Sequence, residues 1–374
     1  MSRLPRRIRQ IARTVIRRLR NLYKTPHASP RHVGSIKSAL IEEAAEARGL
    51  ETLRADRRLV YVKIHGSFVP FEEMTGPSAG SVARYICDNK HHARRFLEGG
   101  GLEVARSQVI RRGEFSSASR FVDEVGYPVV VKPSSEARGR GVQTDIDNPT
   151  LLKKAIRKAG KWGQTILVEE QFDGDDYRVF VVDNKVISVT RRARASVVGD
   201  GASTIRQLID AKNAMRRRNM YLRAYPIPTD LHSLSRLKRS GKSLRHVPGK
   251  GELVTLRDQS NLSMGGDSID VTDTCHAGFK EVAARAVRTI PGLEYAGVDL
   301  LVRDITSEPQ PGAYIVSEVE FFPGPVAHYP VEGTPRDMAG AVLDYYLSRL
   351  NGSSPEEATT AITGKTGNGQ WLPG

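Results

Sequence analysis

The stretch YPVVVKPSSEARGRGV, residues 127–142, constrains the fold more than any other part of the chain. A run of valines typical of a buried strand ends at Lys132, and a loop of small residues containing Gly139 and Gly141 follows directly. Glycines let backbone amides approach a ligand closely, which is how glycine-rich loops receive phosphates. A cation at the mouth of such a loop predicts an anion-binding site at the end of a strand.

Two later strands carry acids. AGVDLLV places Asp299 in the middle of an apolar run, where a lone carboxylate would be costly to bury. In YIVSEVEFFPG, Glu318 and Glu320 are two residues apart and share one face of their strand. Such a cluster needs cations to neutralise it, and ligands that are all oxygen favour Mg²⁺. The alternative is that these acids line a solvated edge.

The bulk composition fits a globular protein. Of 374 residues, 39% are hydrophobic and 26% are charged, and no apolar run approaches the roughly 20 residues that span a membrane. The two cysteines, Cys87 and Cys275, make a disulfide framework unexpected. We therefore expect a soluble, cytoplasmic protein in a reducing compartment.

The net charge of +15 is concentrated in two segments. Residues 1–24 contain nine Arg or Lys residues and no acid, with apolar residues at helical spacing. This basic amphipathic helix could lie on an anionic membrane, dock on a partner, resemble an import sequence or pack on the body. Residues 212–250 form a second basic block, which is either a solvated face or a docking surface for an acidic substrate.

Helical and strand patterns alternate along the rest of the chain, which indicates an α+β (α/β-like) enzyme layout. We predict an arm and linker at 1–34, a short first region at 35–86, a main domain at 87–350 and a flexible tail at 351–374. Asp273 is expected to cap a helix ending at Ile290. Thr334, with Pro335 at the first helical position, is expected to open a last helix ending near Leu350. Predicted helices and strands are 35–48, 59–64, 90–99, 127–132, 165–169, 177–182, 185–190, 295–302 and 314–321.

From Lys90 to Leu350 the chain resembles the ATP-grasp ligases, and specifically the ATP-grasp module of cyanophycin synthetases and bifunctional glutathione synthetases. The similar pieces occur in family order, and they are DNKHHARRFLEGGGLEVARSQV, GYPVVVKPSSEARGRGV, ILVEEQFDGDDYRVFVV, RRARASVVGDGASTIRQLI, NLSMGGDSIDVTD, AGVDLLV and EVEFFPGPVAHYPVEGTPR. The resemblance implies an ATP-grasp fold, in which two α+β subdomains clamp ATP, preceded here by a truncated first domain.

The resemblance also implies roles for residues of the nucleotide site. Lys90 and Lys132 would grip the phosphates, and the loop from Ser134 to Gly141 would fold over them. Glu169 would lie near the adenine amine, with the backbone of Glu170 to Phe172 lining the adenine slot. Asp176 would accept the ribose hydroxyls.

Further implied roles concern the reacting groups. Arg192, perhaps with Arg191, would steady the transferred phosphoryl group, and Mg²⁺, or possibly Mn²⁺, would bind the three acids Asp299, Glu318 and Glu320. The segment containing Asn261, Ser263, Gly265 and Gly266 would line the phosphate and acyl site, while the GDG at 199–201 is a family signature of less certain role.

The chain departs from the family pattern at three places. Glu320 stands where the family commonly has Asn, which adds a negative charge to the metal site. The region before Lys90 is short and weakly similar. We expect neither a Mur-ligase-like half nor a γ-glutamylcysteine-forming half.

The resemblance implies an ATP-dependent carboxylate–amine ligase that forms an amide or peptide bond through an acylphosphate, on an amino acid, a peptide or an acidic chain. One alternative is a basic nucleic-acid or membrane-surface binding protein with a regulatory or inactive nucleotide site, although the 6% aromatic content is low for base stacking. Another is phosphorylation without ligation. The identities of acid and amine, the number of residues added and any homo-oligomer stay open.

Overall fold

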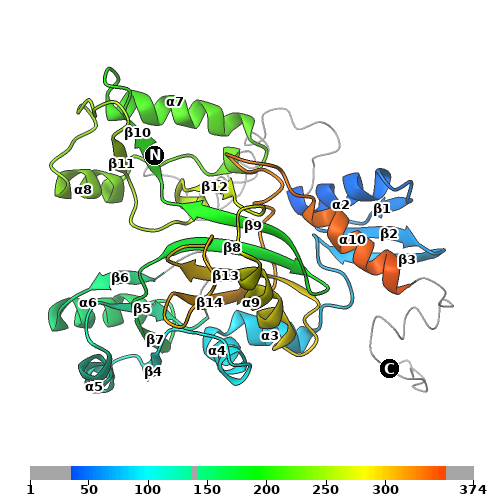
Figure 1. The fold of residues 1–374 in the computed structure, drawn as a ribbon, viewed down its shortest axis with the longest axis horizontal. Coiled ribbons are helices and arrows are strands. Elements are labelled where there is room, and N and C mark those ends of the chain that lie inside the picture. Colours follow the sequence, from blue (N-terminus) through cyan, green and yellow to red (C-terminus); the bar gives the residue numbers. More distant parts are fainter. Residues whose placement is uncertain (1–34, 136–140, 351–374) are drawn as a thin grey trace, which may run out of the picture.

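The computed structural model describes residues 35–135 and 141–350, which form a mixed α+β protein (Figure 1). Within these residues the strands make four sheets, and all neighbouring named strands run antiparallel. The predicted α+β class is confirmed. The predicted arm at 1–34 and tail at 351–374 lie outside the described residues. No helix in the described ranges is long and apolar enough to cross a membrane.

The central sheet has five strands. In spatial order they are β12 (Asp267–Asp270), β9 (Lys185–Ala193), β8 (Asp175–Val182), β13 (Tyr295–Val302) and β14 (Tyr314–Glu320). The β8–β9 hairpin turns at Asp183 and Asn184, which both adopt the left-handed backbone conformation that a two-residue turn needs. One face is apolar, and its valines pack with α9 (Ala277–Arg288) and α3 (Ser81–Asp88) in the main core.

A second sheet carries the glycine-rich loop. Its strands are β4 (Ser107–Arg111), β7 (Thr165–Glu170), β5 (Val129–Pro133) and β6 (Gln143–Ile146). Val131 and Val168 point into a core closed by α5 (Phe115–Val125) and α6 (Pro149–Ala159). Because side chains alternate along a strand, Lys132 and Glu169 point to the opposite face.

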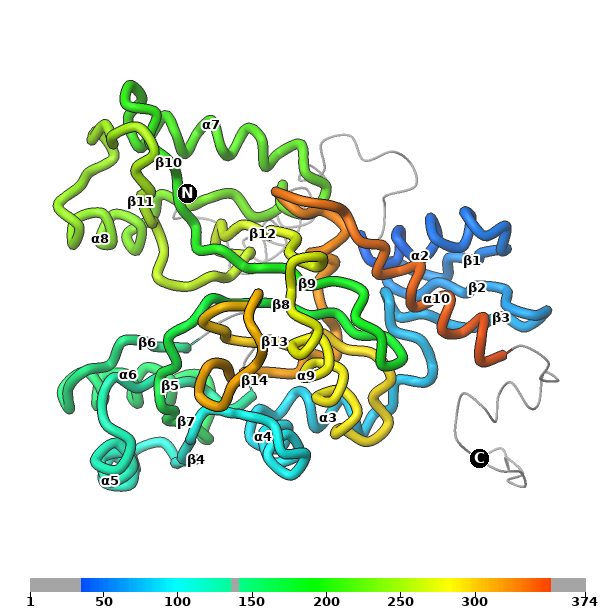
Figure 2. The backbone as a smooth tube through the Cα atoms, viewed as in Figure 1, coloured from blue at the N-terminus to red at the C-terminus, as the bar shows by residue number. Residues whose placement is uncertain are grey.

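The chain's first described region is closed by its last helix. A three-stranded sheet of β1 (Thr52–Arg54), β2 (Leu59–Ile64) and β3 (Ser67–Glu72) lies beside α2 (Ile36–Glu46) and α10 (Met338–Arg349). The blue and orange helices pack side by side in Figure 2, and their core also includes Phe180 and Tyr295 of the central sheet. The region 35–86 therefore shares a core with the main domain.

A separate lobe contains most of the basic block. It consists of β10 (Ser196–Val198), β11 (Leu253–Thr255), α7 (Ile205–Arg218) and α8 (Leu231–Arg239), around a small core of its own. Several of its cations are already paired: Lys212 and Arg216 pair with Asp267 of β12 in the central sheet, while Arg236 and Arg239 pair with Asp258 within the lobe. Part of the positive charge therefore stabilises the lobe itself.

Two predicted helix starts are wrong. The helix expected from Asp273 begins at Ala277, with His276 as its cap, and the helix expected from Thr334 begins at Met338, with Asp337 as its cap. Arg336 explains both differences. It donates hydrogen bonds to Asp270 and Asp273, so the two predicted starts lie in irregular segments that this arginine holds against each other.

His328 near the start of α10 gives a test of this packing. Its Nε2 accepts a hydrogen bond from the Ala339 amide at 3.1 Å, so the ring must be neutral there, and burial lowers its pKa to about 4. The unfolded chain takes up this proton near pH 6.5 and the folded protein only near pH 4. We therefore expect His328 to cost roughly 2–3 kcal/mol of stability as the pH falls through this window.

The measurement is urea denaturation at pH 7 and pH 4.5, with wild type and His328→Gln compared at each pH. The glutamine oxygen can accept the same amide bond without taking up a proton. If the difference in stability between the two proteins is the same at both pH values, the assignment is wrong.

Candidate active site

A row of charged side chains crosses the central sheet on the face opposite α9. Strand register aligns Arg178 of β8 with Asp299 of β13, and Asp299 with Glu318 of β14. On the same face, Arg192 of β9 lies one row away, beside Asp176 of β8. Antiparallel pairing thus gathers residues that are far apart in the sequence.

Asp299 is the centre of this row. Both oxygens of its buried carboxylate accept hydrogen bonds from Arg178, and Arg192 donates to it at 2.7 Å. Burial alone would raise the pKa of Asp299, but the positive charges of Arg178 and Arg192 outweigh it and lower the pKa to about 2. The carboxylate is therefore ionised at neutral pH.

Arg178 is a residue that the sequence prediction missed. It also pairs with Glu320, so one guanidinium holds two of the three predicted metal ligands. The space for it comes from Gly297, where an added Cβ would lie 2.9 Å from the Arg178 Cδ. A signal was available, because Arg178, like Asp299, interrupts a run of buried apolar residues.

Arg192 contacts both a predicted metal ligand and the predicted ribose-binding residue. It donates to Asp176 at 2.6 Å as well as to Asp299, and Asp176 in turn accepts from the Ser260 hydroxyl. Although burial would lower the pKa of Arg192, the charges of Asp176 and Asp299 raise it. The neighbouring Arg191 points to the other side of its strand and makes an ion pair with the exposed Asp175 at 3.4 Å.

A second charged group lies on the sheet that carries the glycine-rich loop. The Glu169 carboxylate pairs with Lys132 at 2.7 Å and with Arg94 at 2.8 Å, and all three side chains are buried. Burial would raise the pKa of Glu169, but its two cationic neighbours lower it. Burial lowers the pKa of Lys132, and the nearby Glu169 only partly opposes this. Arg94 is another residue that the sequence prediction did not single out.

Helix α4 (Lys90–Gly99) connects the two charged groups. Lys90 and Arg94 are one turn apart, so they project from the same side of the helix. Lys90 pairs with Glu318 of the central sheet, whereas Arg94 pairs with Glu169 of the other sheet. The side chain of Asn89 caps this helix, and the Lys90 amide donates to the Ser134 carbonyl at 3.1 Å, which ties the helix to the start of the loop.

The remaining predicted nucleotide residues are more scattered. Glu170 is half-buried and pairs with Arg106, and Phe172 lies under the guanidinium of Arg303. Ser134 is buried, Gly141 has a positive φ of 75° and Gly139 lies outside the described residues. Ser134 is joined to Lys90 by the backbone hydrogen bond described above, and the roles of all these residues remain predictions.

The segment 261–266 packs against the end of β9. A Cβ on Gly266 would lie 2.7 Å from the Ala193 carbonyl oxygen, so this close approach requires glycine. The GDG segment has a structural role in the lobe. Asp200 accepts from the amides of Ala202 and Ser203, which turns the chain into α7.

The three predicted metal ligands suit Mg²⁺ in kind, since all are carboxylates on neighbouring strands. In the described part of the chain, however, no three His, Cys, Asp or Glu side chains are grouped closely enough to hold a metal ion. The reason is that each acid is turned toward a cation: Glu318 toward Lys90, and Asp299 and Glu320 toward Arg178. The donor atoms are of the type that Mg²⁺ binds, but they would be available to it only if these pairs opened.

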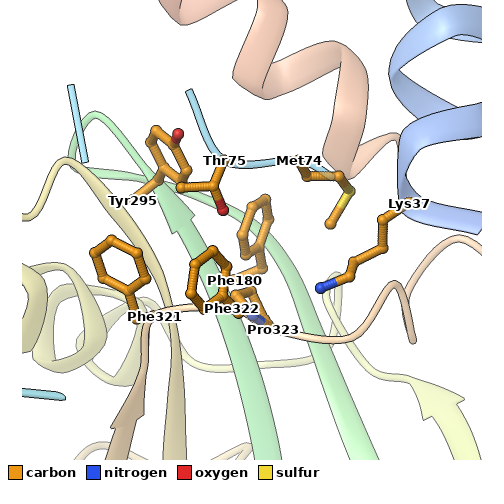
Figure 3. A pocket seen from close by; sticks show the side chains of 8 residues that line it. All are labelled: Lys37, Met74, Thr75, Phe180, Tyr295, Phe321, Phe322 and Pro323. Carbon is orange, nitrogen blue, oxygen red and sulfur yellow. The ribbon is translucent and has the colours of Figure 1, made fainter. Parts of the chain in front are cut away.

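An apolar pocket lies next to the charged row (Figure 3). Phe180, Phe322 and the ammonium group of Lys37 turn toward one another there, at the junction of the central sheet with α2 and the β3–α3 connection. Its volume of about 10 Å³ holds no more than about one water molecule. The pocket lies at the end of the charged row and is too small to accommodate an amino acid.

Comparison with known proteins fits this arrangement. Residues 96–214 match the family model described as the D-ala D-ala ligase C-terminus. The chain is thus similar to ATP-grasp ligases. Its fold is that of a bifunctional glutathione synthetase from Pasteurella multocida, with a TM-score of 0.64 and 23% identity over 85% of this chain and 44% of that one. The predicted ATP-grasp fold is confirmed.

Curated relatives are longer than this chain. It is 33% identical over 342 residues to the cyanophycin synthetase of Trichormus variabilis, which covers 89% of this chain and 37% of the relative. It is 31% identical over 310 residues to the glutathione biosynthesis bifunctional protein of Enterococcus faecalis, which covers 79% of this chain and 40% of the relative. Residues 90–350 make up less than 89% of the chain, so the similarity to the cyanophycin synthetase extends beyond that segment.

The buried triad of Glu169, Lys132 and Arg94 predicts a large difference between two adjacent glutamates. Glu169→Ala leaves two buried cations without their partner, and we expect it to lower the free energy of unfolding by about 3–5 kcal/mol. The matched control is Glu170→Ala, which removes an exposed pair with Arg106 and should cost less than about 1 kcal/mol. Urea denaturation measures both. Equal losses would contradict the buried pairing.

Proposed function

We propose that this protein is an ATP-dependent carboxylate–amine ligase that forms an amide or peptide bond through an acylphosphate. One observation carries the proposal. Lys90 and Arg192, predicted to bind the phosphates and the transferred phosphoryl group, pair with the predicted metal ligands Glu318 and Asp299. Lys132, the other predicted phosphate-binding lysine, pairs with Glu169 on the second sheet, and α4 bridges the two sheets.

This pairing would stabilise the buried charges of the site when neither nucleotide nor metal is bound. A buried charge is stable only with a partner, and the partners here are interchangeable. When the nucleotide enters, its phosphate oxygens can take over Lys90 and Lys132, and Glu318 becomes available to a metal. Every buried charge then keeps a neighbour of opposite sign before and after ATP binds.

The chemistry that follows is positioning and charge stabilisation. A substrate carboxylate oxygen attacks the γ-phosphorus, the bond to the β-phosphate oxygen breaks, and ADP and an acylphosphate result. A neutral amine then attacks the acyl carbon, the bond to the phosphate oxygen breaks, and the amine loses a proton as the amide forms. Arg192 would stabilise charge on the transferred group, and excluding water would protect the acylphosphate from hydrolysis.

Asp299, Glu318 and Glu320 would hold Mg²⁺, with Mn²⁺ as a possible substitute because it also accepts oxygen ligands. The metal would neutralise phosphate oxygens during the transfer. The extra charge of Glu320 is already matched by Arg178, so the departure from the family's Asn does not leave the site with an unpaired acid.

For the substrate we propose an amino acid, a peptide or an acidic chain. The names of the relatives support an amide-forming reaction on amino acids. Exposed basic side chains of the lobe that have no acidic partner within the described residues, such as Lys238 and Arg245, could attract an acidic substrate. Membrane contact through residues 1–24 and assembly into a homo-oligomer remain separate hypotheses. No specific feature of the described residues favours nucleic-acid binding.

The proposal predicts ADP release that requires both an acid and an amine. Folded protein is incubated with Mg-ATP and panels of amino acids and peptides, and products are identified by mass spectrometry. An amide product with one ADP per bond is expected. A stable phosphorylated product without amide would instead indicate phosphorylation alone, and no amine-dependent ADP release across a broad panel would count heavily against ligation.

Glu318→Ala tests the metal assignment. We expect kcat/KM to fall about 100-fold or more, because a group that stabilises transition-state charge is lost. The control Glu281→Ala removes an exposed acid from α9, on the opposite face of the sheet, and should leave turnover unchanged. Thermal unfolding checks that both variants fold. Full activity of Glu318→Ala would remove Glu318 from the site.

A further inference from the structure

Arg178 forms ion pairs with two of the acids that a metal ion would need as ligands. Its guanidinium donates to both oxygens of Asp299 and also pairs with Glu320. The side chain is buried, with 6% of its surface exposed, and its slot exists because position 297 is glycine. This is a built contact in the strand register, since Arg178 lies directly across from Asp299 on the neighbouring strand.

The other two cations of the row have different positions. Arg192 is shared between Asp299 and Asp176, and Lys90 pairs with Glu318 alone. Only Arg178, among the described residues, bridges two of the three predicted metal ligands. Removing it would free Glu320 completely and expose one side of the Asp299 carboxylate.

Charge balance decides when a metal can enter. The three acids already pair with three cations, so a free divalent ion would add two positive charges next to the cations that surround the buried Asp299 and its partly exposed neighbours Glu318 and Glu320. It would also leave the Arg178 guanidinium buried without its partners, which is strongly unfavourable. A triphosphate arriving with the metal supplies the negative charge that removes this penalty.

We propose that Arg178 is a resident counter-ion that keeps the metal out of the site until a nucleotide is bound. It holds Asp299 and Glu320 in place in the nucleotide-free protein. When metal and nucleotide enter together, Arg178 gives up Glu320 to the metal. This inference rests on the proposed nucleotide site, and it adds that metal affinity depends on the nucleotide.

The test measures Mn²⁺ binding through the loss of the free-ion electron paramagnetic resonance signal, with and without an unreactive ATP analogue. Wild-type protein should bind Mn²⁺ at least about tenfold more tightly with the analogue present. Arg178→Gln should bind Mn²⁺ roughly 10- to 100-fold more tightly than wild type when no nucleotide is added. The control Arg288→Gln removes the same charge from the exposed side of α9 and should behave as wild type.

Arg178→Gln leaves Asp299 with one cation and could unfold the protein, so a charge-balanced pair accompanies it. Glu320→Asn alone keeps Arg178 on Asp299, whereas Arg178→Gln with Glu320→Asn removes one charge of each sign. The double variant should bind Mn²⁺ more tightly without nucleotide than Glu320→Asn does. Equal Mn²⁺ affinities in this pair would overturn the role of Arg178.

The wild-type measurements separate this inference from the proposed function. Tight Mn²⁺ binding without nucleotide, in a protein that also binds the analogue, would overturn the counter-ion role and leave the ligase proposal standing. Failure of the folded protein to bind the analogue, measured by calorimetry with Mg²⁺ present, would instead overturn the nucleotide site on which both depend.

Discussion

The structure depends on how it balances charge that is buried between its two main sheets. Asp299 is ionised inside the protein only because Arg178 and Arg192 lie against it, and Glu169 is ionised only because Lys132 and Arg94 do. Each of these pairs is too buried for water to replace a missing partner. The positions of the sheets and of α4 are therefore linked to the pairing of these groups.

The central sheet combines two environments on one face. Toward β12 and the middle of the strands this face is charged, with Asp176, Arg178 and Asp299 in adjacent rows. Two residues further along β8, Phe180 and Val182 enter the apolar core under α10. One face of β8 therefore contributes first to the site, through Asp176 and Arg178, and then to the core, through Phe180 and Val182. The small aromatic pocket in Figure 3 lies at the boundary between the site and the core.

The positive net charge has several separate uses. In the lobe, Lys212 and Arg216 pair with Asp267 and fix α7 to the end of the central sheet. In the site, five cations face five carboxylates, namely Lys90, Arg94, Lys132, Arg178 and Arg192 against Asp176, Glu169, Asp299, Glu318 and Glu320. Under the proposed function, a balanced site of this kind would exchange internal partners for a phosphate and a metal.

Local sequence determined the elements whose pattern is complete within a few residues. The strands at 59–64 and 295–302 and the helix at 90–99 were predicted at their observed bounds, because alternation and capping are short-range properties. The sequence also indicated that Lys132, Asp299 and Glu318 carry the chemistry, since charges in apolar strands need a reason. Only the tertiary structure decided their partners. Arg178 meets Asp299 through strand register, and Arg336 crosses from one segment to another and displaces two helix starts. Such contacts join residues far apart in the chain, and no local pattern encodes them.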